Sequence, residues 1–125
     1  MQLFKPLIVF LACTACGHPT PPEQRMRGLW RNDFEGSQFC AAPAKECGYV
    51  SRGNRTGPIV FMDFSISLPA KWKGLQLGGL YAVDFVGRHY ASHGHYGHLG
   101  AFDEAVVVDR MISIREIEAP PRREE

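Results

Sequence analysis

The stretch that decides the fold is LYAVDFV at residues 80–86, followed by a glycine- and histidine-rich connection at 87–100 and by VVVDRMISIREI at 106–117. Side chains alternate between the two faces of a strand, so Tyr81, Val83 and Phe85 would share one face. The second run has a matching hydrophobic face, made of Val106, Val108, Ile112 and Ile114. The stretch therefore predicts two strands joined by a loop at the centre of the fold.

Further short strands are expected on the N-terminal side of this pair. Residues 59–68 alternate well, with a hydrophobic face made of Val60, Met62, Phe64, Ile66 and Leu68. Residues 28–39 indicate a strand interrupted by turn residues, a shorter strand is expected at 48–51, and residues 23–27 could form one helical turn. Five or six short strands with turns between them predict an all-β fold, a small antiparallel barrel that is OB-like in size and strand number; the alternative is a small β-sandwich.

The composition limits the classes of partner. The chain has 125 residues, which is one domain, and its 14 Lys and Arg nearly balance 13 Asp and Glu. No overall field attracts the protein to nucleic acid, so a nucleic-acid partner is not expected. The 13 glycines and 9 prolines leave little room for long helices.

The N-terminus has the three regions of an export signal. Lys5 is followed by an apolar run at residues 7–12 and then by small residues up to Gly17. The run is too short to span a bilayer as a helix, which needs about 20 apolar residues. It predicts a signal peptide at 1–15 and a protein that leaves the cytoplasm.

Cys13-Thr14-Ala15-Cys16 resembles the lipobox of bacterial lipoproteins, although the usual leucine three positions before the modified cysteine is replaced by Cys13. The resemblance implies acylation of Cys16, with Cys13 as the alternative site, and anchoring of the protein on the periplasmic side of the outer membrane, since Gly17 stands where inner-membrane lipoproteins often have aspartate. Ordinary cleavage after Ala15, giving a soluble periplasmic protein, is the other alternative. A lipidated N-terminus and proline-rich spacer would occupy 16–27, the barrel 28–118, and a disordered charged tail 119–125.

Cys40 and Cys47 are expected to form a disulfide, because two cysteines close in sequence pair in an oxidising periplasm. Their spacing departs from the gap typical of zinc cysteines and of redox-active pairs.

Four histidines lie in or beside the glycine-rich connection: His89, His93, His95 and His98. In an extended chain His93 and His95 project to one side, and His89 or His98 could supply a third ligand for zinc or copper, a cofactor otherwise not expected. A packed or solvated loop is the alternative, since three glycines make ordering on an ion costly.

Aromatic residues offer a second kind of site. Trp72 could close the barrel or form an exposed platform, and Tyr90 and Tyr96 could belong to the same ligand surface. No Gly-x-Ser-x-Gly, phosphate-binding loop or His-Glu-x-x-His sequence is present, so catalysis is not expected. The sequence predicts a membrane-anchored, non-catalytic module that binds an envelope protein or a glycan, with metal binding as the alternative.

Overall fold

The computed structural model describes residues 20–33, 35–49, 58–68, 77–91 and 94–120. The predicted signal peptide, the lipidation cysteines, Trp72 and His93 lie outside these ranges, as does the tail after Pro120. The elements are β1 (Gln24–Arg31), β2 (Gln38–Ala41), β3 (Val60–Phe64), β4 (Leu80–Tyr90), a 3-10 turn η2 (His98–Gly100) and β5 (Glu104–Glu118). No helix in the described ranges is long and apolar enough to cross a bilayer.

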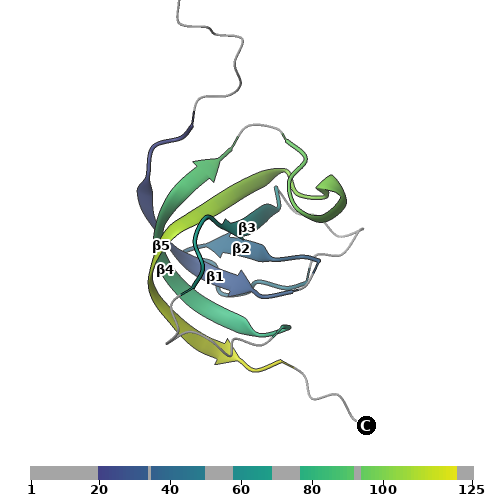
Figure 1. The fold of residues 1–125 in the computed structure, drawn as a ribbon. Helices are drawn as coiled ribbons and strands as arrows, with labels where there is room; N and C mark the ends of the chain where they lie inside the picture. Colours follow the sequence, from purple (N-terminus) through teal and green to yellow (C-terminus); the bar gives the residue numbers. More distant parts are fainter. Residues whose placement is uncertain (1–19, 34, 50–57, 69–76, 92–93, 121–125) are drawn as a thin grey trace, which may run out of the picture.

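The five strands form one sheet that closes on itself in the order β1-β2-β3-β5-β4 (Figure 1). The expected central pair is confirmed: β4 and β5 run antiparallel from Leu80 opposite Glu118 to Tyr90 opposite Ala105. Antiparallel pairing of β1 with β4 closes the ring. The prediction of an all-β, OB-like fold is therefore confirmed.

One pairing differs from the expected antiparallel pattern. β3 and β5 are parallel, with Val60 opposite Glu104 and Phe64 opposite Val108. The chain reverses at β4 between them, and β4 lies on the other side of β5. β3 and β5 therefore point the same way and become neighbours.

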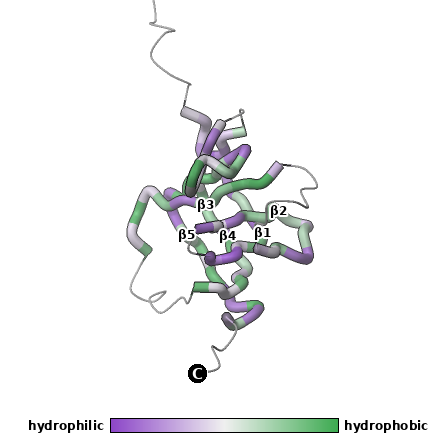
Figure 2. Tube along the Cα trace, turned by 90° about the vertical axis from the view of Figure 1, so that its right-hand side faces the viewer, coloured by the Kyte–Doolittle hydropathy of each residue, from purple (hydrophilic) through white to green (hydrophobic). Residues whose placement is uncertain are grey.

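The inward faces of all five strands form one core. On β4, Tyr81, Val83 and Phe85 are buried, as their alternation predicts. Figure 2 shows the exchange of hydrophobic and hydrophilic residues along the strands. The other strands contribute Trp30, Phe39, Met62, Val106, Val108 and Met111.

Two irregularities in the β4–β5 ladder correct the predicted face of β5. Gly87 pairs with Val108 and Val86 with Arg110, so Asp109 has no opposite residue. A second shift leaves out Ile112, which lies between the partners of Phe85 and Asp84. Each extra residue changes the phase of the alternation. Met111 therefore occupies the core position that was expected for Ile112.

Three predicted boundaries are also wrong. β1 begins at Gln24, inside the predicted spacer, because residues 24–27 pair with β4 rather than forming a helical turn. β3 ends at Phe64, after which the chain bends and Ile66 is exposed. Gly48 and Tyr49 are not in a strand, and the rest of the strand expected at 48–51 lies outside the described residues.

The predicted disulfide between Cys40 and Cys47 is present, with the two Cα atoms 5.7 Å apart. It joins the end of β2 to the segment that follows. Arg31 is buried beside it and donates from Nε to the carbonyl oxygen of Cys47 at 2.9 Å. The same guanidinium donates to the carbonyl oxygen of Gly78 at 3.1 Å. The disulfide segment and the start of β4 are thus both tied to the end of β1.

Candidate ligand-binding cleft

The segment that connects β4 to β5 forms a cleft with the outer side of β3 and β5. The space measures about 330 Å³. We call it the β4–β5 cleft. It is lined by Phe61, Asp63, Tyr90, His95, Tyr96, Gly97, Ala105 and Val107.

The described part of this connection is held by its own hydrogen bonds. The backbone N–H groups of Tyr96 and Phe102 each donate to the other residue's carbonyl oxygen, both at 3.1 Å. Phe102 is buried, and its ring centroid lies 5.2 Å from that of Phe61 on β3. Gly97 has φ +73°, and a Cβ there would lie 2.9 Å from the Phe61 ring, so glycine is required for this close packing. The connection is packed against the barrel on one side of the cleft.

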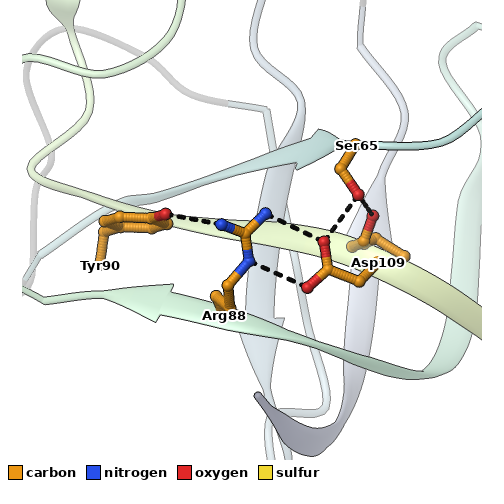
Figure 3. A network of polar contacts seen from close by, with 5 residues as sticks. Ser65, Arg88, Tyr90 and Asp109 are labelled. Atoms are coloured by element: carbon orange, nitrogen blue, oxygen red, sulfur yellow. Dashed lines mark hydrogen bonds and ion pairs between the residues drawn. The ribbon is translucent and has the colours of Figure 1, made fainter. Parts of the chain in front are cut away.

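Tyr90 is oriented by a polar network on the outer side of the barrel (Figure 3). Arg88 donates from Nη1 to the Tyr90 hydroxyl oxygen at 3.0 Å. The same guanidinium forms a two-pronged ion pair with Asp109, at 2.9 and 3.0 Å. The Ser65 hydroxyl lies 2.7 Å from the Asp109 carboxylate. Strands β4 and β5 and the residue after β3 therefore fix one tyrosine at the edge of the cleft.

The charge state of this network follows from its hydrogen bonds. Those from Arg88 and then Ser65 lower the pKa of the Asp109 carboxyl group, and the bond to Asp109 raises the pKa of Arg88. Both groups are ionised at neutral pH, and protonation of Asp109 at acidic pH would remove this contribution to stability.

The other tyrosine and a histidine face the same space. The ring centroids of Tyr96 and Tyr90 are 6.4 Å apart. His95 Nδ1 lies 3.3 Å from the carbonyl oxygen of Gly100. Because a carbonyl oxygen can only accept, this contact places a proton on Nδ1 and leaves Nε2 of the neutral ring as an acceptor. Asp63, exposed on β3, adds a carboxylate.

The structure thus brings together two of the three residues expected on a ligand surface, Tyr90 and Tyr96, and joins His95 to them. Sequence reasoning missed Phe61 and Asp63 as lining residues. The alternation of residues 59–68 placed Asp63 on the outer face of its strand. It could not show that the connection 91–103 lies over that face.

The predicted metal ligands are not brought to one place among the described residues. His89 lies within β4, and its Nε2 is 2.6 Å from Oε1 of Glu104. It lines a different pocket from the one that His95 lines. His93 and the side chain of His98 are outside the described part, within which no three His, Cys, Asp or Glu residues could hold an ion together. Zinc or copper binding stays a prediction.

Comparisons with protein-family models, with curated proteins and with solved structures find no match to this chain. The function is therefore argued from the chemistry of the cleft.

Proposed function

We propose that this chain is a non-catalytic binding module, anchored by lipid on the periplasmic side of the outer membrane, whose β4–β5 cleft holds sugar rings of an envelope glycan. The observation that supports this role is the meeting of Tyr90 and Tyr96 with two polar groups, Asp63 and His95, in one cleft. OB barrels bind oligosaccharides and oligonucleotides through strands 2 and 3 and the loop between strands 4 and 5. The cleft lies at the corresponding place.

The charges near the cleft favour a sugar over a nucleic acid. Binding to a phosphate backbone depends on lysine and arginine side chains that replace counterions. The described lining residues include Asp63 and no lysine or arginine. Arg88 nearby is paired with Asp109. Two arginines of β1, Arg25 and Arg27, both contact Asp84, whose carboxyl pKa is lowered mainly by the hydrogen bond from Arg25.

Sugar rings suit this combination of groups. The C–H face of a pyranose is apolar enough to lie on a tyrosine ring, while its hydroxyl groups donate hydrogen bonds. Carboxylate oxygens of Asp63 and Nε2 of His95 can accept them. Hydrolysis of a glycosidic bond generally requires two carboxyl groups on either side of that bond. Asp63 is the single carboxylate among the described lining residues, which favours binding without cleavage.

Tyr96→Ala tests the cleft. In titrations of the full chain with N-acetylglucosamine oligomers, we expect saturable binding to the wild-type protein and an affinity about tenfold lower for the variant, because an aromatic stacking surface is lost. Tyr90→Phe keeps the ring and removes the contact with Arg88, so a smaller loss is expected.

Tyr49→Ala is the matched control, since Tyr49 is half exposed and lies outside the described lining of the cleft. Its affinity should equal that of the wild type. An equal loss in Tyr49→Ala and Tyr96→Ala, or no binding by the wild-type chain to any oligomer, would contradict the proposed site.

Cys16→Ala tests the anchor separately. β1 begins eight residues after Cys16 (24 − 16 = 8), a distance of at most about 29 Å for an extended chain, so a lipid on Cys16 would hold the barrel close to the membrane surface. We expect the variant to lose labelling by radioactive palmitate and to move from the membrane fraction to the soluble fraction. Labelling that persists in Cys16→Ala and disappears in Cys13→Ala would move the modified residue to Cys13.

A further inference from the structure

The interior of the barrel is filled unequally at its two ends. Where β1 and β3 end and β4 begins, the ring of Trp30 packs against Phe64 at 5.2 Å and against Tyr81 at 5.6 Å. In the middle, Phe39 and Phe85 meet edge to face at 5.3 Å. Toward the other end the aromatic rings give way to smaller or more flexible side chains. Large side chains therefore close one end and leave space at the other.

That space is a pocket of about 250 Å³ at the end where β1, β3 and β5 begin and β4 ends. We call it the barrel-mouth pocket. Met26 and Val60 on its wall are partly buried and pack against the core, and Phe39 and Val106 are buried. The lining residues are Gln24, Met26, Arg27, Phe39, Ala41, Val60, His89 and Val106.

The charged groups at this mouth are compensated. His89 lies against Glu104 at 2.6 Å, with side chains 34% and 17% exposed. Arg27 contacts Asp84 at 3.1 Å. An anionic ligand would meet the carboxylate of Glu104, and a cationic one would compete with the imidazole for that carboxylate. A neutral hydroxyl group can accept from one partner and donate to the other without a charge being buried unpaired.

We propose that the barrel-mouth pocket binds a single alkyl chain with a neutral hydroxyl head group. The hydrocarbon lies against Met26, Val60 and Val106, and the hydroxyl group lies beside the His89–Glu104 pair. Burial of the chain supplies the affinity, and the thioether of Met26, which has several rotamers, adapts to its shape. This site is separate from the β4–β5 cleft and does not depend on the proposed glycan role.

Methionine methyl groups provide a direct test in the full-length chain. Met26 lines the pocket, whereas Met62 and Met111 are buried in the core and do not line it. With 13C-labelled methionine methyl groups, titration with 1-octanol should give a saturable shift of the Met26 signal, while the Met62 and Met111 signals serve as internal controls. Octanoate and octylamine should bind at least about tenfold more weakly, because each adds a charge beside a paired one.

A pocket-filling variant provides the second arm. Val60→Phe should abolish the octanol-dependent shift, and Val86→Phe, the same change on the outer side of β4, should retain it. The proposal is wrong if the Met26 shift does not saturate, or if all three methionine signals move together as in nonspecific partitioning. Octanoate binding as tightly as octanol would overturn the neutral head group, and unchanged octanol binding to folded Val60→Phe would overturn the location.

Discussion

Phe85→Ala is expected to lower the free energy of unfolding by about 3–5 kcal/mol, the range for loss of a buried phenylalanine. Phe85 is 0% exposed and lies at the middle of the longest inward face of β4. Its ring packs edge to face on Phe39, and its neighbours across the ladders are Met26 and Met111. Side chains from β1, β2 and β5 therefore lose contacts at once. Urea denaturation followed by circular dichroism should show a lower midpoint with an unchanged slope.

The control is Val86→Ala, one residue further along β4 and on the outer side. We expect a loss below about 1 kcal/mol, since outer positions contribute less burial. A Phe85→Ala variant that is no less stable than Val86→Ala would contradict the inward placement of Phe85 and, with it, the closed sheet.

Replacing both cysteines of the disulfide by serine, in Cys40→Ser/Cys47→Ser, is expected to lower the free energy of unfolding by about 2–3 kcal/mol. The cross-link closes a short loop and restricts the unfolded chain, which is its main stabilising effect in the loop-entropy description. In the folded state it also positions the carbonyl oxygen of Cys47 that accepts from buried Arg31. Thermal unfolding of the oxidised wild-type chain and of the variant should show the difference.

Reductant provides the control for this pair. Added to the wild-type chain, it should lower the unfolding midpoint to near that of the double variant, and added to the double variant it should change nothing. If reduced and oxidised wild-type chains unfold at the same temperature, the disulfide contributes nothing to stability and the prediction fails.

The fold class follows from local patterns in the sequence, whereas the details of pairing do not. Alternation correctly placed Tyr81, Val83 and Phe85 in the core, because a strand has a fixed period of two. The same rule failed at Ile112, since the extra residues at Asp109 and Ile112 exist only in the register with β4. The start of β1 at Gln24 likewise depends on pairing with β4 and has no local signal.

The candidate site was predictable to a similar extent. Tyr90 and Tyr96 stood out because they lie in a connection rich in histidine and glycine. The network of Ser65, Arg88 and Asp109 joins three segments that are distant in sequence, so no local spacing could reveal it. His89 was grouped with the other histidines of the connection, but β4 extends through it and its imidazole contacts Glu104 instead.

The parallel pair of β3 and β5 has a consequence for the order of folding. Its residues are far apart in sequence, as the 44 positions between contacting Ser65 and Asp109 illustrate. β4 and β5 are joined by a much shorter connection and share the longest ladder. Because long chain closures have a larger entropic barrier, we expect the β4–β5 hairpin to form early and to offer β5 as the template on which β3 docks. Until that docking occurs, β5 has an unpaired edge, and newly made chains are most exposed to intermolecular strand pairing during this interval.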